Sequence, residues 1–133
     1  MTYYLNKNIP TRKNGQPEHE MQVQIVNYLK SHPSHPLFTA TVGGVRLAAH
    51  TAMKMRAAGY SKGTPDLLIF EPRGQYHGLA LEVKTEKGRP SDEQKKWIAD
   101  LNERGYCAKI TRGYKETVET IKNYLDGNHL GNP

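Results

Sequence analysis

Two carboxylates and one lysine, Asp66, Glu82 and Lys84, have the types and spacing of a metal-dependent hydrolytic site. Glu82 and Lys84 stand two residues apart in the apolar run 79–84, so a strand would direct both side chains to the same face. Asp66 begins a second apolar run, 66–70, directly after a proline and a glycine-containing turn. Antiparallel pairing of the two runs could bring Asp66 beside Glu82, because opposed residues lie only about 5 Å apart.

Such a pair of carboxylates predicts a divalent cation between them. Two carboxylates at that distance repel each other, and a hard cation such as Mg²⁺ or Mn²⁺ prefers oxygen ligands of this kind. A cation held there polarises a phosphodiester and lowers the pKa of a bound water, while Lys84 stabilises negative charge or orients the attacking water. The combination indicates phosphodiester hydrolysis. Alone, an Asp after Pro is usually a turn residue, and a Glu-x-Lys pair is usually a solvated strand face.

The elements that must position these residues follow from hydrophobic periodicity and turn signals. A helix is expected from Pro17 until His32-Pro33, and a capping box with Ser91 as N-cap and Gln94 at the third helical position opens another. Strands are predicted at 37–42, 66–70, 77–84 and 106–111, and further helices at 47–58 and 115–125. The run 66–70 is apolar on consecutive residues, so we expect that strand to be buried on both faces. This order of elements predicts an α/β sandwich with a mixed sheet.

The sequence also predicts which side chains of the C-terminal half are buried. Trp97, Ile98 and Leu101 should form the buried stripe of their helix, which Gly105 closes. Cys107 should be a buried thiol in a strand, and a single cysteine excludes an internal disulfide. The last helix should turn four side chains inward: Val118, Ile121, Tyr124 and Leu125.

Size and charge limit the organisation and the partners of the chain. At 133 residues it can bury one core, and we expect a flexible arm at 1–16, one domain at 17–125 and a flexible tail at 126–133. A net charge of +6 and a pI near 9.4 suit a polyanionic partner, but they also fit a basic protein without one. The sequence has no N-terminal apolar segment and no membrane-length apolar run, so we expect a cytoplasmic protein.

Pro65-Asp66 and Glu82-Val83-Lys84, each on an apolar strand and separated by a turn, have the layout of the PD-(D/E)xK nucleases. Further motifs occur in matching order at 63–67, 77–85, 88–94 and 105–106, with the sequences GTPDL, HGLALEVKT, GRPSDEQ and GY. Together with Glu18 ahead of them, they closely resemble the VRR-NUC family, the virus-type replication-repair nuclease domain, over roughly residues 17–125. The resemblance implies a restriction-endonuclease-like core, with a central mixed β-sheet flanked by α-helices.

In that family, as the resemblance implies, an acidic residue on the first helix joins the strand carboxylates at the metal. We assign this role to Glu18, because it lies in register with the apolar face of its helix whereas Glu20 points elsewhere. The predicted metal ligands are thus Glu18, Asp66, Glu82 and the backbone carbonyl of Val83. The alternative for Glu18 is that it only complements the helix dipole.

The resemblance also implies that Gln94 approaches the active site. Its capping-box bonds explain it without catalysis, and we expect the two uses to compete for one side chain. Six basic residues are predicted to contact nucleic acid: four of them are as readily ordinary solvated charges, and two lie close enough to the predicted metal to hold a phosphate. They are Arg46, Lys54, Arg56 and Lys62 as a strip along the DNA backbone, and Lys87 and Arg89 in the loop after the catalytic strand.

The function implied by the resemblance is a divalent-metal-dependent endonuclease that hydrolyses DNA and acts on branched structures such as Holliday junctions. A homodimer of phage or bacterial origin is implied as well, and two-fold pairing would extend the small surface of one domain. One alternative is a DNA-binding module that keeps the fold without catalysis, which the intact Asp66, Glu82 and Lys84 disfavour. Another is a nuclease acting mainly on RNA, although no residue identifiably reads a 2′-hydroxyl.

Overall fold

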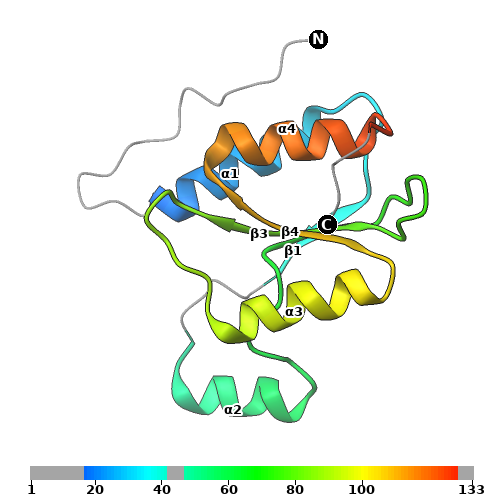
Figure 1. Ribbon diagram of the computed structural model, residues 1–133. Helices are drawn as coiled ribbons and strands as arrows, with labels where there is room; N and C mark the ends of the chain where they lie inside the picture. Colours follow the sequence, from blue (N-terminus) through cyan, green and yellow to red (C-terminus); the bar gives the residue numbers. More distant parts are fainter. Residues whose placement is uncertain (1–16, 42–46, 129–133) are drawn as a thin grey trace.

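The computed structural model describes residues 17–41 and 47–128, and a four-stranded mixed sheet lies at the centre of the molecule (Figure 1). The strands are β1 (Phe38–Ala40), β2 (Leu67–Ile69), β3 (Leu79–Lys84) and β4 (Cys107–Arg112), and they neighbour one another in chain order. β2 pairs antiparallel with both β1 and β3, whereas β3 and β4 pair parallel through a crossover that contains α3 (Asp92–Glu103). Strand β3 therefore has a partner on each side.

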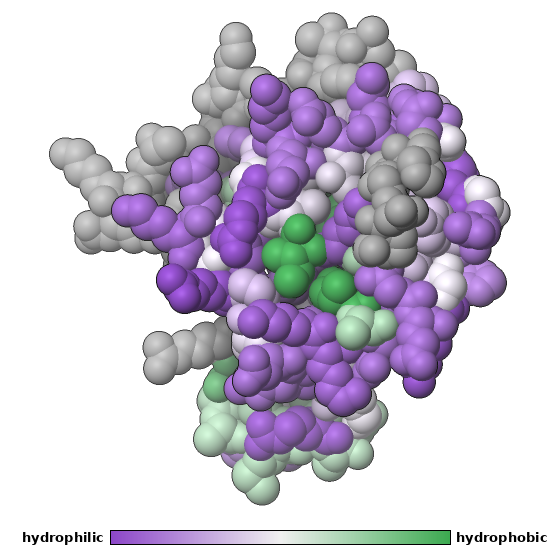
Figure 2. All heavy atoms as spheres, viewed as in Figure 1, coloured by the Kyte–Doolittle hydropathy of each residue, from purple (hydrophilic) through white to green (hydrophobic). Residues whose placement is uncertain are grey.

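Helices cover both faces of the sheet. α1 (Pro17–Ser31) and α4 (Gly113–Leu125) lie together on one face, and α3 lies on the other (Figure 1). α2 (Ala49–Ala57) lies beyond α3, apart from the sheet, and none of its residues is buried. Figure 2 shows a largely hydrophilic surface on this side of the molecule, with mostly weakly hydrophobic side chains over α2 at the bottom and a small strongly hydrophobic group near the centre. The arrangement confirms the predicted α/β fold with a mixed sheet between helical layers.

The main core fills the space between the sheet and the layer of α1 and α4. Ile25, Tyr28 and Leu29 recur at helical spacing on α1 and are fully buried there. Alternation along β3 directs its three predicted core residues, Leu79, Leu81 and Val83, into the same cluster. Of the inward residues predicted on α4, Ile121, Tyr124 and Leu125 are buried and Val118 is partly buried against the core.

The layer between α3 and the sheet is less apolar than predicted. Trp97, Ile98 and Leu101 are only partly buried, and α3 contains no fully buried residue, so the prediction of a buried stripe is wrong. α3 lies mainly against β4, and the face of β3 that it also covers contributes to this. There the strand presents small Ala80 followed by two charged side chains, which leaves little apolar surface for the helix to bury.

The predicted boundaries of helices and strands agree with the structure to within two residues. Strand β2, however, is not buried on both faces as its composition predicts, since Leu68 is partly exposed and Phe70, just after the strand, is 50% exposed. α3 packs over β3 and β4, which lie toward the opposite edge of the sheet from β1. Cys107 is buried, as predicted. No helix within the described ranges combines the length and apolar character that a membrane crossing requires.

Candidate active site

The pairing of β2 with β3 brings Asp66 and Glu82 to the same place in the sheet. Leu67 is opposite Leu81, and the same antiparallel register continued by one residue sets Asp66 opposite Glu82. Opposed residues direct their side chains to the same face. Both carboxylates are buried, with exposed fractions of 9% for Asp66 and 2% for Glu82. The predicted antiparallel hairpin is therefore confirmed, and it joins the two acids.

Asp66 is held from both neighbouring strands. On the β3 side, the Val83 N–H donates to the carboxylate Oδ2 at 2.9 Å. On the β1 side, the Thr41 N–H donates to the Asp66 carbonyl at 2.9 Å, and the Thr41 hydroxyl donates to the Pro65 carbonyl at 2.7 Å. These bonds fix the position of the carboxylate within the sheet. Thr41 was not predicted from the sequence, because it carries no motif and meets Asp66 only through strand pairing.

The turn before Asp66 depends on a glycine that touches α3. Gly63 has a φ of +91°, and a Cβ placed on it would lie 2.7 Å from the carbonyl carbon of Glu93. Only a residue without a side chain allows the turn and the helix to approach this closely. The same helix therefore supports the turn that leads into Asp66 and carries Gln94 in its first turn.

Glu82 uses one carboxylate oxygen and leaves the other free for a ligand. Its Oε1 accepts a hydrogen bond from Gln94 Nε2 at 2.7 Å and lies 3.2 Å from Lys84 Nζ. Its Oε2 is buried and has no hydrogen-bond partner among the described residues. A buried polar atom without a partner destabilises a fold by about 1–3 kcal/mol or more, and a bound cation would remove that penalty. The oxygen donors present therefore fit a divalent metal such as Mg²⁺.

Burial changes the proton affinity of both carboxylates. It raises the pKa of Glu82 to about 7, with a further increase from the negative charge of Asp66 and a decrease from the Lys84 ammonium. Burial also raises the pKa of Asp66, while the Val83 hydrogen bond and Lys84 lower it. One lysine thus faces two desolvated acids. The pair lacks positive charge, and a cation between the carboxylates would supply it.

Gln94 takes part in the helix cap and, through its side chain, also contacts the active-site residue Glu82, the two roles that we expected to compete. Its Oε1 accepts a hydrogen bond from the Ser91 N–H at 2.8 Å, and its own N–H donates to Ser91 Oγ at 3.1 Å, which confirms the predicted capping box. Its Nε2 meanwhile donates to Glu82 Oε1. The expected competition is wrong, because an amide carries an acceptor on one atom and donors on another. The helix cap therefore orients the side chain that contacts Glu82.

Glu18 lies in the first turn of α1, where it is exposed. Its charge makes a small contribution that raises the pKa of Asp66, so the two carboxylates are within electrostatic reach of each other. In the part of the chain that the structure describes, no three His, Cys, Asp or Glu side chains are grouped closely enough to hold a metal ion. The preassembled part of the site is the pair Asp66 and Glu82. Ligation by Glu18 and by the Val83 carbonyl stays a prediction.

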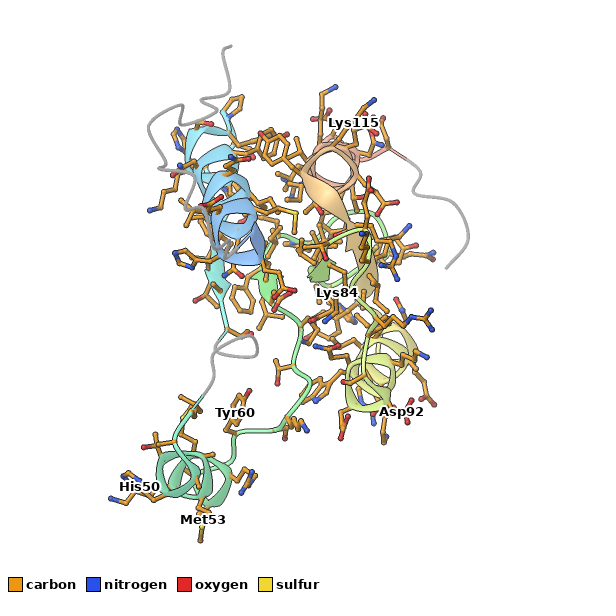
Figure 3. All side chains as sticks on the ribbon, turned by 90° about the vertical axis from the view of Figure 1, so that its left-hand side faces the viewer. His50, Met53, Tyr60, Lys84, Asp92 and Lys115 are labelled. Carbon is orange, nitrogen blue, oxygen red and sulfur yellow. The ribbon has the colours of Figure 1, made fainter. Side chains whose placement is uncertain are left out.

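The predicted nucleic-acid contacts of the N-terminal half lie in several places. Arg46 falls outside the described residues. Lys54 and Arg56 are exposed on α2, and Figure 3 shows this helix well apart from Lys84. Lys62 is exposed as well, 3.9 Å from an acidic side chain of α3. The structure therefore does not bring Lys54 and Arg56 to the buried carboxylates, and any contact that they make with nucleic acid is remote from the site.

Lys87 and Arg89 line a cavity of about 720 Å³ beside the end of β3. Two further basic residues that were not predicted, Lys95 and Arg112, line the same cavity. Lys95 directly follows the capping-box glutamine, and this adjacency is a signal that could have identified it. Arg112 is the partner of Lys84 in the parallel register of β3 and β4, a relation that no local sequence pattern reveals.

Comparisons with known proteins agree with this architecture. The model of the VRR-NUC domain family matches residues 7–115. A solved structure described as a VRR-NUC domain protein is similar with a TM-score of 0.74 and 29% identity, covering 86% of this chain and 92% of that chain. A second solved VRR-NUC domain is similar in fold, with a TM-score of 0.50 and 21% identity over 78% of this chain and 97% of that chain.

Among curated proteins, the Fanconi-associated nuclease 1 homolog of Arabidopsis thaliana is 38% identical over 80 residues. The match covers 55% of this chain and 9% of the plant protein, so the chain spans a small part of that relative's length. The family match begins inside the expected N-terminal arm, and the limits of the predicted domain stay a prediction. Because the family model matches most of the sequence, and the motifs already resemble it, the chain belongs to the VRR-NUC domain family, a family of nuclease domains.

Proposed function

We propose that this chain is a divalent-metal-dependent endonuclease that hydrolyses the phosphodiester bonds of DNA. One observation carries the proposal. Asp66 and Glu82 are buried and opposed across β2 and β3, and Glu82 keeps one buried oxygen without a partner in the described ranges. Membership of the VRR-NUC family supports the same reaction, as does the similarity to a plant protein named as a nuclease. The net charge of +6 suits a polyanionic substrate.

The proposed site divides its tasks among a few groups. Asp66 and Glu82, joined by Glu18 and the Val83 carbonyl, would hold Mg²⁺ or Mn²⁺, which when bound supplies Lewis acidity toward the phosphodiester and an acidified water. Lys84 is held 3.2 Å from Glu82 Oε1. Its ammonium provides a fixed positive charge for the negative charge that develops on the scissile phosphate.

Gln94 acts through Glu82 and is a positioning residue. The capping box with Ser91 holds the amide group in place, and the amide in turn holds Glu82 Oε1. Because Oε1 already receives the Gln94 amide and the Lys84 ammonium, Oε2 is the oxygen that remains for a cation.

From the resemblance to VRR-NUC nucleases we propose branched DNA, such as a Holliday junction, cut by a homodimer in a bacterial or phage-infected cell. A two-fold pair would present two active sites to two strands of one junction. Exposed Lys54, Arg56 and Lys62, with Arg46, would contact the DNA backbone away from the cut.

Cleavage assays on matched substrates test the proposal. Labelled four-way junctions, flaps, linear duplexes and the corresponding RNA structures are incubated with the purified chain and Mg²⁺ or Mn²⁺, with EDTA as the blank. We expect metal-dependent cuts in branched DNA. If no substrate is cut although DNA is bound, the chain is the non-catalytic DNA-binding module instead. Stronger cleavage of RNA than of the matched DNA would overturn the assignment of DNA as substrate.

Two active-site variants identify the residues responsible. Glu82→Gln and Lys84→Ala should abolish cleavage, while their binding to DNA in EDTA stays close to that of the wild type. Glu119→Gln removes the same charge from an exposed position on α4 and should cleave normally. Cleavage that survives in Glu82→Gln would place the reaction at another site.

A further inference from the structure

The loop between β3 and α3, together with the end of β4, forms a basic cavity of about 720 Å³. Four basic residues, Lys87, Arg89, Lys95 and Arg112, and one acidic residue, Glu86, contribute to its lining. We propose that the basic cavity binds one backbone phosphate of the substrate strand next to the bond that is cut. This inference rests on the proposed function and adds the direction in which the strand leaves the active site.

The basic side chains of the cavity are not neutralised by acidic partners in the described part of the chain. The ion pairs found there join other residues, and none includes any of the four. Against the one carboxylate of Glu86, the four basic groups leave a net charge of +3 around the cavity, out of +6 for the whole chain. Such an excess attracts anions, and a bound phosphodiester releases its condensed counterions.

Arg112 shapes the basic cavity by fixing its loop. Its Nη1 donates to three carbonyls of that loop, those of Thr85 at 3.2 Å, Glu86 at 3.3 Å and Gly88 at 2.5 Å. The bonds tie the loop after β3 to the end of β4, where Arg112 is the strand partner of Lys84. A guanidinium has further N–H donors on its other nitrogens, which these bonds do not use. The loop carrying Lys87 and Arg89 is therefore anchored independently of any ligand.

Two contacts join the basic cavity to the carboxylate site. Gly88 lies against the stem of Lys84, since a Cβ on this glycine would be 3.4 Å from Lys84 Cδ. In the first turn of α3, Gln94 contacts Glu82 while the next residue, Lys95, lines the cavity. One strand can therefore place neighbouring phosphates in the cavity and at the carboxylates. Because the cavity and the carboxylate site are in contact through Gly88 and the first turn of α3, we expect the cavity to bind a backbone phosphate of the substrate and not an unrelated anion.

Binding in EDTA tests the basic cavity independently of cleavage. Fluorescence anisotropy gives the Kd of a labelled four-way junction for the wild type, for Arg89→Gln/Lys95→Gln, and for the charge-matched control Lys30→Gln/Lys122→Gln. All four replaced side chains are exposed, so the fold should be kept, and a thermal unfolding midpoint near that of the wild type verifies this. The control residues lie in the last turns of α1 and α4, away from the cavity lining.

We expect the Kd of the cavity variant to rise about tenfold relative to the control, since a hydrogen bond to a charged group is lost. The slope of log Kd against log salt should fall by about 1 for each phosphate contact removed. Equal binding by the cavity variant and the control would overturn the proposal.

Substitution of single phosphates by neutral methylphosphonates locates the contact. The wild type should lose affinity when a position beside the cut is made neutral, and Arg89→Gln/Lys95→Gln should be insensitive at that position. A cavity variant that responds like the wild type overturns the cavity proposal and leaves the nuclease proposal intact. If the wild type cuts no nucleic acid, the nuclease proposal fails, while a cavity-specific loss of affinity would still support phosphate binding there.

Discussion

Replacing Glu82 with glutamine should make the metal-free protein more stable at neutral pH. Burial raises the pKa of this carboxyl from 4.5 to about 7, so the folded state favours the protonated form. Its contribution to stability is complete below pH 4.5 and is lost as the pH rises through about 7, because the unfolded chain can then ionise freely. At about 1.36 kcal/mol per pKa unit the full effect is about 3 kcal/mol, so the effect near pH 8 should be at least about 2 kcal/mol.

Urea and thermal unfolding in EDTA, from about pH 4.5 to about pH 8, measure this effect. Near pH 8 the free energy of unfolding of Glu82→Gln should exceed that of the wild type by about 2 kcal/mol, or about 4 to 8 °C in Tm. The difference should shrink as the pH falls toward 4.5. Glutamine keeps an oxygen acceptor for the Gln94 amide and for Lys84. Added Mg²⁺ should stabilise the wild type and leave the variant unchanged.

Two results would refute this reasoning. If Glu82→Gln is less stable than the wild type near neutral pH, the ion pair with Lys84 outweighs the effect of burial. If the difference does not change with pH, protonation of Glu82 is not linked to folding. Glu119→Gln is the matched control, since it replaces an exposed carboxylate on α4 and should show no pH-dependent change.

Further substitutions separate the roles of the neighbouring elements. Gln94→Ala removes one bond of the capping box, from the Ser91 N–H to Gln94 Oε1, together with the contact with Glu82, so it should lower the free energy of unfolding by about 1 to 2 kcal/mol in urea and also reduce kcat. Ser91→Ala removes the other capping bond, from the Gln94 N–H to Ser91 Oγ, and keeps the Gln94 side chain, so it should keep more activity; equal kcat values for the two would contradict the positioning role. Gly63→Ala should destabilise the fold by more than about 2 kcal/mol, because it combines a left-handed backbone with a clash against α3. Gly74→Ala is the control, because Gly74 has a φ of +54° but open space around it, and its free energy of unfolding should fall by about 1 kcal/mol. Equal decreases for Gly63→Ala and Gly74→Ala in urea would show that the turn can move away from α3.

The carboxylate pair could be predicted from the sequence because it depends on local relations. Strand alternation sets Glu82 and Lys84 on one face, and the short connection between the apolar runs favours an antiparallel partner that begins at Asp66. The cap formed by Gln94 is equally local. The second hydrogen bond of the Gln94 side chain, to Glu82, connects α3 to the sheet. The sequence did not predict it together with the cap, because we expected the two contacts to compete for one side chain.

The remaining features depend on relations between distant segments. Arg112 reaches the loop after Lys84 because β3 and β4 pair in parallel across an intervening helix, and no local pattern fixes that register. The same limit explains the exposure of Phe70. An apolar run indicates that residues tend to be buried, but it does not show which helix covers them, and α3 packs over β3 and β4.

Single-turnover cleavage of a labelled four-way junction, with and without Mg²⁺, tests most directly whether Asp66 and Glu82 form a metal site for phosphodiester hydrolysis. The comparison is between the wild type and Glu82→Gln, once unfolding has shown that the variant is at least as stable. We predict cleavage by the wild type only with metal, and a rate that is lower by at least about 10²- to 10³-fold in the variant. Equal rates for the two proteins, or wild-type cleavage that persists in EDTA, would contradict this assignment.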